Sequence, residues 1–354
     1  MTRSHLFFFA SALLILTGCS GNRANEAAKT VNLYIYSEYM DPEIISEFAQ
    51  KSGYEVRISL YENTEEMLAK LQQAGGVSQY DVVVVSDHAV PVLAKLNLIQ
   101  KLDKTKIPNA ANVDPMFADP VYDPASLYSM PYQWGTVGLL FRKDAIQQGE
   151  TPSWGWLLDP SRIPGPFVLI DSMRDMLGGT LKYLGYSVNT RNPDELRQAG
   201  DLLLTAKKHD QSLGFEGGTG GKSKVLSGGA SLAVVWNGDA VKAMDEDPNL
   251  AFGLPVEGTV LWTDAMTIPA KAPNAAGGLA FINFILDPRI GAKLSDWNRY
   301  ATPNAAARPL VQPSDRANPA IYPPDEEVKK GEYLEDIGAD TRLYDEVWTS
   351  VKSR

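Results

Sequence analysis

The chain is poor in the two residue types that most often hold transition metals. It has one cysteine, Cys19, and three histidines, His5, His88 and His209. One cysteine cannot form an internal disulfide, and two histidines beyond the N-terminal segment cannot supply a histidine-based zinc or iron cluster. The sequence also lacks a GxSxG motif, so an esterase with a Ser-His-acid arrangement has little support. We therefore expect no metal site, no cofactor and no catalytic residue.

Basic residues are also few. The chain has 33 lysines and arginines against 43 aspartates and glutamates, a net charge of −10 at pH 7. Without a basic stripe it has little to attract a phosphate backbone, so nucleic acid is not an expected partner. Most surface carboxylates only keep a protein soluble, so the positions of the acids matter more than their number. With 354 residues, 44% of them hydrophobic, the chain is large enough for two lobes.

The first 19 residues carry an export signal. Arg3 precedes an apolar run, Leu6 to Leu16, that is shorter than the roughly 20 residues of a membrane-spanning helix. The motif LTGC, which ends at Cys19, resembles the bacterial lipobox, which is cut before a cysteine that then receives lipid. We expect a lipoprotein signal peptide at 1–18, a polar tether at 19–30, and an exported protein on the periplasmic or cell-surface side, lipid-anchored to a membrane. The alternative is a cysteine that merely ends a signal segment.

From Val31 onward, short apolar strands alternate with amphipathic helices. The run Val82 to Val85 is continuously β-branched, as expected for a strand that is covered on both faces in a parallel sheet. The pattern predicts a doubly wound α/β lobe, in which ligands bind beyond the carboxyl ends of the strands. The expected strands are 31–36, 54–61 and 80–86, and the expected helices are 42–53, 64–75 and 88–99.

A second α/β set follows a stretch rich in proline and tryptophan, and we expect the change of lobe near Trp134. The predicted strands of this set are 167–171, 231–236 and 259–269, and the predicted helices are 172–186, 237–244, 277–298 and 336–353. The segment EGGTGGKS, 216–223, resembles a phosphate loop. However, Glu216 replaces its first glycine and no clear strand leads into it, so we interpret it as a mobile glycine-rich turn.

Acids and aromatic residues gather at the predicted strand ends. Carboxylates bind ammonium groups by charge-assisted hydrogen bonds, and aromatic faces attract cations and pack on methylenes, so the set suits an organic cation. A glycosidase needs only two such acids. The alternative is that some of the acids are helix caps, that Asp175 forms a capping box with Ser172, and that the tryptophans belong to the core. The residues are Glu38, Asp87, Asp171, Asp175, Asp239, Asp264, Tyr36, Tyr39, Trp236, Trp262 and Tyr300.

Eight segments together resemble the polyamine-binding proteins of bacterial spermidine/putrescine ABC importers, an extracellular solute-binding protein family. In order they are YSEY, YDVVVVS, SMPYQWGTVGL, VVWNGDA, LWTDAMTIPA, FINFILDP, YATPNAAAR and KGEYLEDIGA. The resemblance implies a two-lobed, type II Venus flytrap, each lobe a mostly parallel sheet flanked by helices, with the ligand in the cleft. The implied N-lobe is 31–134 plus 265–307, and the implied C-lobe is 135–264 plus 308–354.

The resemblance also implies the ligand-binding residues. Trp236 would flank the methylene chain, Asp264 would hold the deep ammonium group, and Asp239 matches the putrescine-preferring branch. Asp175 aligns with a glutamate and Tyr36 with a tryptophan. The full implied set is Tyr36, Ser37, Glu38, Tyr39, Ser86, Asp87, Asp175, Trp236, Asp239, Trp262, Asp264 and Tyr300. Departures from the family pattern fall at His88, Ser172 and Leu334.

These observations lead us to expect a non-enzymatic, monomeric substrate-binding component of a polyamine importer. It would capture putrescine, or spermidine, and deliver it to an ABC permease and its ATPase in the inner membrane. Three alternatives stay open: a binder of another cationic solute, an exported glycosidase, and a lipoprotein with a purely structural cleft. The other solutes are a cationic amino acid or ferric iron, for which Tyr34, Tyr36 and Tyr39 are superficially suitable.

Overall fold

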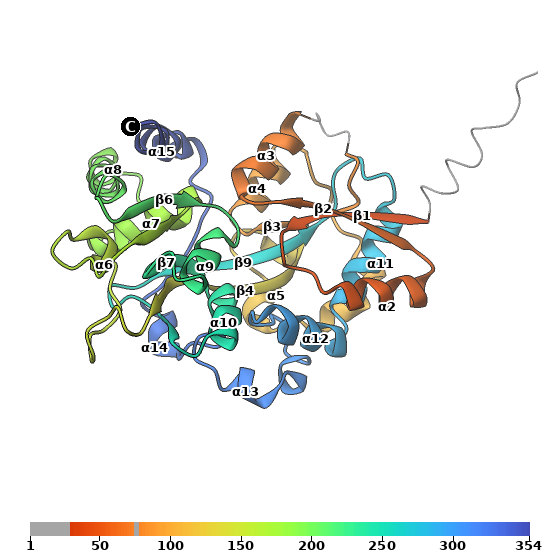
Figure 1. Cartoon of the computed structure of the whole chain (residues 1–354). Coiled ribbons are helices and arrows are strands. Elements are labelled where there is room, and N and C mark those ends of the chain that lie inside the picture. Colours follow the sequence, from red (N-terminus) through yellow and green to blue (C-terminus); the bar gives the residue numbers. More distant parts are fainter. Residues whose placement is uncertain (1–28, 74–77) are drawn as a thin grey trace, which may run out of the picture.

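The computed structural model describes residues 29–73 and 78–354, which fold into two α/β lobes joined by two long strands (Figure 1). The predicted signal peptide at 1–18, Cys19 and the tether up to residue 28 lie outside the described residues. Within the described ranges, no helix has the length and apolarity needed to cross a membrane.

The first lobe has the predicted alternation of strands and helices. Its strands β1 (Thr30–Tyr36), β2 (Glu55–Tyr61) and β3 (Val82–Ser86) are parallel in the order β2-β1-β3. The four valines of β3 are 0% exposed, as expected for a strand covered on both faces. The helices that follow these strands are α2 (Pro42–Ser52), α3 (Thr64–Gln73) and α4 (Ala89–Lys95).

Local sequence signals explain the bounds of α2. The Asp41 side chain accepts a hydrogen bond from the backbone N–H of Glu43 at 2.8 Å, Pro42 occupies the first turn, and Gly53 ends the helix in the left-handed region at φ 75°. Each is the preferred residue for its position. The helix therefore begins immediately after the loop that carries Ser37, Glu38 and Tyr39.

The second lobe repeats this arrangement. Strands β5 (Phe167–Ile170), β6 (Ser212–Glu216) and β7 (Leu232–Trp236) are parallel in the order β7-β5-β6, and β8 (Leu250–Gly253) pairs with β4. The helices are α6 (Gly155–Leu158), α7 (Met173–Tyr183), α8 (Pro193–Lys207), α9 (Gly220–Leu226), α10 (Asn237–Glu246) and α15 (Thr341–Ser353). The interpretation of 216–223 as a turn without a preceding strand was wrong, because β6 leads into it and α9 begins within it.

Two antiparallel strands connect the lobes. The first part of β4 (Ser129–Arg142) pairs with β9 (Val260–Thr267), and from Val137 onward β4 pairs with β7. The lobe change that we predicted near Trp134 falls inside β4, close to this exchange of partners. Strand β9 also pairs antiparallel with β3. It is therefore not a further parallel strand of the second set, and Trp262 and Asp264 lie within it rather than at its end.

The chain then returns to the first lobe. The predicted helix 277–298 is two helices, α11 (Ala275–Ile285) and α12 (Pro288–Asn298), separated where Asp287 caps the second one. After α12, Ala307 and Val311 pack with Ala292 of that helix, so contact with the first lobe extends a few residues past 307. The remaining elements are η1 (Lys104–Lys106), η2 (Pro108–Asn112), α5 (Pro115–Ala118), η3 (Pro124–Ser126), η4 (Arg308–Leu310), α13 (Pro313–Arg316), α14 (Asp325–Val328), β10 (Glu332–Tyr333) and η5 (Gly338–Asp340).

Candidate ligand-binding site

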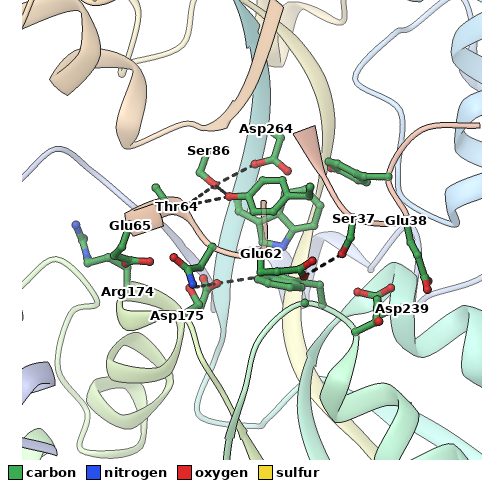
Figure 2. A pocket seen from close by; sticks show the side chains of 18 of the residues that line it. Ser37, Glu38, Glu62, Thr64, Glu65, Ser86, Arg174, Asp175, Asp239 and Asp264 are labelled. Atoms are coloured by element: carbon green, nitrogen blue, oxygen red, sulfur yellow. Dashed lines mark hydrogen bonds between the residues drawn. The ribbon is translucent and has the colours of Figure 1, made fainter. Parts of the chain in front are cut away.

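A cavity of about 60 Å³ lies between the lobes, where the carboxyl ends of the parallel strands of both lobes meet (Figure 2). This volume is large enough to hold several water molecules. Eleven of the twelve predicted ligand-binding residues line it. The lining consists of Tyr36, Ser37, Glu38, Tyr39, Glu62, Asn63, Thr64, Glu65, Ser86, His88, Ser172, Arg174, Asp175, Gly218, Thr219, Trp236, Asp239, Trp262, Asp264, Tyr300 and Leu334.

Asp87 is the predicted residue that does not line the cavity. Its side chain is buried, and its carboxylate accepts hydrogen bonds from the backbone N–H groups of His88, at 2.7 Å, and Thr263, at 3.1 Å. These bonds attach the turn after β3 to β9. The structure therefore gives Asp87 a structural role in place of the predicted contact with ligand.

Asp264 is held at the inner wall of the cavity. It lies opposite Ser86 across the β3–β9 pair, and the Ser86 hydroxyl donates to its Oδ1 at 3.1 Å. The hydroxyl of Tyr36 hydrogen-bonds with Ser86 at 3.0 Å and with Thr64 at 2.9 Å. Burial raises the pKa of Asp264 to about 7, and the nearby carboxylate of Asp87 adds to the rise. A cation beside this group would restore its charged form.

Asp175 supplies a second buried carboxylate from the other lobe. It lies in the first turn of α7, and its Oδ2 accepts from the Ser172 hydroxyl at 2.8 Å and from Trp236 Nε1 at 3.1 Å. Ser172 is the N-cap residue of α7, but its hydroxyl donates to Asp175, so the suggested capping box is not formed as predicted. Burial raises the pKa of Asp175. We call Asp175 and Asp264 the acid end of the cavity.

At the opposite side of the cavity, two lining carboxylates pair with a lysine that does not itself line the cavity and that sequence reasoning missed. Lys222 Nζ donates to Glu38 Oε2 at 2.8 Å and lies 3.8 Å from Asp239 Oδ1. The hydrogen bond from Lys222 lowers the pKa of Glu38, whereas burial raises the pKa of Asp239. Tyr300 donates from its hydroxyl to Asp239 Oδ2 at 3.1 Å. We call Glu38, Lys222 and Asp239 the lysine end.

Aromatic rings from both lobes form the walls between these ends. Tyr300 packs edge to face on Tyr39, with ring centres 5.3 Å apart, and on Trp262 at 5.2 Å. The ring of Trp236 lies 6.3 Å from that of Tyr36 across the cleft. Tyr34, by contrast, is a buried core residue that stacks on Tyr80 outside the cavity lining. The walls offer ring faces to methylene groups or cations.

The first turn of α10 packs closely against the ring of Tyr300. A Cβ atom on Gly238 would lie 2.6 Å from the Tyr300 ring, nearer than side chains can come. Gly238 is therefore the residue in the first turn of α10 that leaves room for the ring.

Several lining residues were not predicted. Glu62, Asn63, Thr64 and Glu65 follow β2, and the same rule of acids after parallel strands would have found Glu62 and Glu65. Burial raises the pKa of Glu65. Gly218 and Thr219 come from the segment that we interpreted as a turn. His88, Ser172 and Leu334, the departures from the family pattern, all line the cavity.

The arrangement of carboxylates and aromatic rings is suited to binding a cation. Within residues 29–73 and 78–354, no group of three or more His, Cys, Asp or Glu side chains is placed to hold a metal ion. Carboxylates reach the cavity from both lobes, and rings lie between them. Such a site offers charge at two places and an apolar surface between.

Comparisons with known proteins agree with this geometry. A family model described as "Bacterial extracellular solute-binding protein" matches residues 43–321. The chain is 34% identical over 324 residues to the spermidine/putrescine-binding periplasmic protein of Escherichia coli (strain K12), covering 92% of each chain. It is 33% identical to the putrescine-binding periplasmic protein SpuD of Pseudomonas aeruginosa (strain UCBPP-PA14), covering 98% of each. A solved structure provisionally described as a spermidine/putrescine ABC transporter of Listeria monocytogenes superposes with a TM-score of 0.85 at 32% identity, covering 92% of this chain and 99% of that one.

Proposed function

The chain belongs to the bacterial extracellular solute-binding protein family, and from that premise we propose that it is the substrate-binding component of a polyamine ABC importer. It binds putrescine in the interlobe cavity and delivers it to a membrane permease and its ATPase. The observation that carries the proposal is the pair of buried carboxylates at the acid end, Asp175 and Asp264, which come from different elements and face a cavity walled by aromatic rings.

Closure of the cleft is expected because the residues that would contact the ligand come from both lobes. Asp264 lies on β9 beside the first lobe, whereas Asp175 and Trp236 belong to the second. A ligand that touches both sets gains its full interaction energy only when the lobes are closed, so it favours the closed form. The closed form is then the one presented to the permease.

Two features support putrescine ahead of spermidine. Leu334 offers no polar group to a third amine, and Asp239 stands in the WNGD segment that matches putrescine-preferring proteins. The iron alternative is less well supported, because Tyr34, one of its three tyrosines, packs in the core outside the cavity lining.

We further propose the anchoring and the division into lobes. Lipid on Cys19 would attach the folded body, a monomer, to the membrane through the tether. The chain would pass from the first lobe to the second within β4, near residue 134, and return to the first lobe within β9, near residue 264. It would enter the second lobe again after residue 311, instead of after residue 307 as predicted.

Calorimetric titration tests the main proposal. The protein is unfolded and refolded to remove bound solutes, and then titrated with putrescine, cadaverine, spermidine, spermine, arginine and ferric citrate. We expect binding of putrescine with the highest affinity in the series. Absence of heat with every polyamine would refute the proposal, and visible absorbance with ferric citrate would favour the iron alternative.

A further inference from the structure

Lys222 places a positive charge of the chain itself between the lobes, beside two carboxylates that line the cavity. It is 7% exposed and reaches from α9, in the second lobe, to Glu38 on the loop after β1, in the first. Its Nζ also lies 3.8 Å from Asp239 Oδ1. A second lysine, Lys242, donates to the backbone carbonyl of Glu38 at 3.2 Å. The two carboxylates of the lysine end therefore already share an ammonium group before any ligand arrives.

The acid end differs in the charge of its partners. Asp264 accepts from the Ser86 hydroxyl, and Asp175 accepts from Ser172 and Trp236, all of which are neutral donors. Figure 2 shows Glu38 and Asp239 at the right of the cavity and Asp175 at its left, with Asp264 between them at the top. In this view Asp175 and the lysine end lie on opposite sides, and within the described residues only the lysine end has an ammonium group hydrogen-bonded to one of its carboxylates.

Arg174 does not change this contrast, although it lines the left side of the cavity. Its guanidinium donates to the backbone carbonyl of Glu335 at 3.2 Å and to Asn189 Oδ1 at 2.8 Å, and it packs over the ring of Tyr344. None of these three partners lines the cavity. Arg174 also interacts electrostatically with Asp175 and Glu65, but its hydrogen bonds go to Glu335 and Asn189.

On the basis of the proposed function, we propose that Lys222 is a specificity-determining residue that selects short diamines against longer polyamines. Its ammonium occupies the Glu38–Asp239 pair, so a ligand needs to bring positive charge only to the acid end. The additional ammonium of a triamine, which would extend along the cavity toward the lysine end, meets a like charge there. Such juxtaposition of like charges disfavours the longer ligand.

The test compares putrescine and spermidine affinities, by calorimetry, for the wild type and a series of variants. Lys222→Met keeps the length of the side chain but removes its charge, and the affinity ratio of spermidine to putrescine should rise by about tenfold or more. Lys222→Arg keeps the charge and should leave the ratio near that of the wild type. Lys224→Met is the matched control, because Lys224 lies on the same helix but pairs with Glu216 at the surface.

A double variant keeps the test decisive if Lys222→Met alone does not fold. Glu38→Gln combined with Lys222→Met removes both partners of the ion pair, leaves Asp239 free for the ligand, and should raise the same ratio. Equal changes in both affinities in these variants would overturn the inference, since Lys222 would then only help to close the cleft. A wild type that binds neither ligand would instead refute the proposed function.

Discussion

Replacing Asp264 by Asn should make the ligand-free protein more stable while it removes polyamine binding. The carboxylate is buried, and its hydrogen bond from Ser86 can be accepted equally well by an amide oxygen. Asn therefore keeps the shape and the hydrogen bond but carries no charge that burial disfavours. Because the charge is what a ligand ammonium would pair with, binding is lost in the same variant.

The magnitude follows from the pKa of Asp264. Burial raises it from 3.8 to about 7, a difference that corresponds to roughly 4 kcal/mol. The folded state holds this proton more tightly than the unfolded state, so the wild type loses stability as pH rises from about 4 to 7 and then stays level. The gain from Asp264→Asn should therefore reach up to about 4 kcal/mol at pH 8 and shrink steadily as pH falls toward 4.

Thermal unfolding of ligand-free protein at pH 8 and pH 5 measures this difference. The variant should melt several degrees above the wild type at pH 8, and the gap should narrow at pH 5. Asp87→Asn is the control, because that carboxylate accepts two backbone N–H groups and its replacement should lower the melting temperature at both pH values. If Asp264→Asn melts at or below the wild-type temperature at pH 8, the reasoning from buried charge is wrong.

Three further predictions concern binding. Putrescine needs Asp264 ionised, so its dissociation constant should rise about tenfold per pH unit below 7 and stay level from 7 to 8, and a flat calorimetric profile from pH 5 to 7 would contradict this. Trp236→Ala removes a ring from the wall and should weaken putrescine binding about tenfold, whereas Trp236→Phe should retain most of the affinity. Gly238→Ala should displace the Tyr300 ring and weaken putrescine binding in a folded protein. Gly229→Ala is the control, because its added Cβ meets only ordinary van der Waals contacts and should leave the affinity unchanged. Equal affinities for the two variants would show that the position of the Tyr300 ring is not needed for binding.

Much of the fold could be predicted because its signals are local. The β-branched run Val82 to Val85 shows a strand covered on both faces, and Asp41 and Gly53 show where α2 begins and ends. Acids and rings directly after such strands meet at one edge, which is how Glu38 and Asp239 were found. The same rule applied to β2 also predicts Glu62, so the sequence contains the signal for this residue.

The rest depended on tertiary structure. Asp264 was predicted at the end of a strand but lies within β9, because the antiparallel direction of β9 is set by pairing with β3 and β4. Asp87 and Glu38 both follow a strand, and only the hydrogen bonds from the backbone N–H groups of His88 and Thr263 distinguish the buried carboxylate of Asp87 from one that lines the cavity.

Lys222 shows this dependence most clearly. It stands in a glycine-rich segment whose local pattern resembles a turn, and its partner Glu38 is 184 residues away in the sequence. No pattern within either segment could pair them.

The burial that raises the pKa of Asp264 also links ligand binding to closure. In an open cleft the carboxylate would be hydrated and would ionise near its ordinary pKa, so closing the lobes around it without a cation costs up to the same few kcal/mol. A ligand ammonium removes that cost only in the closed form, and this difference is what shifts the population toward closure. At the lysine end, Lys222 already performs this neutralisation for Glu38, which favours closure whether or not a ligand is bound. The lysine end therefore keeps the ligand-free protein in the closed form, in which Asp264 has its raised pKa, and a ligand at the acid end would stabilise that closed form further.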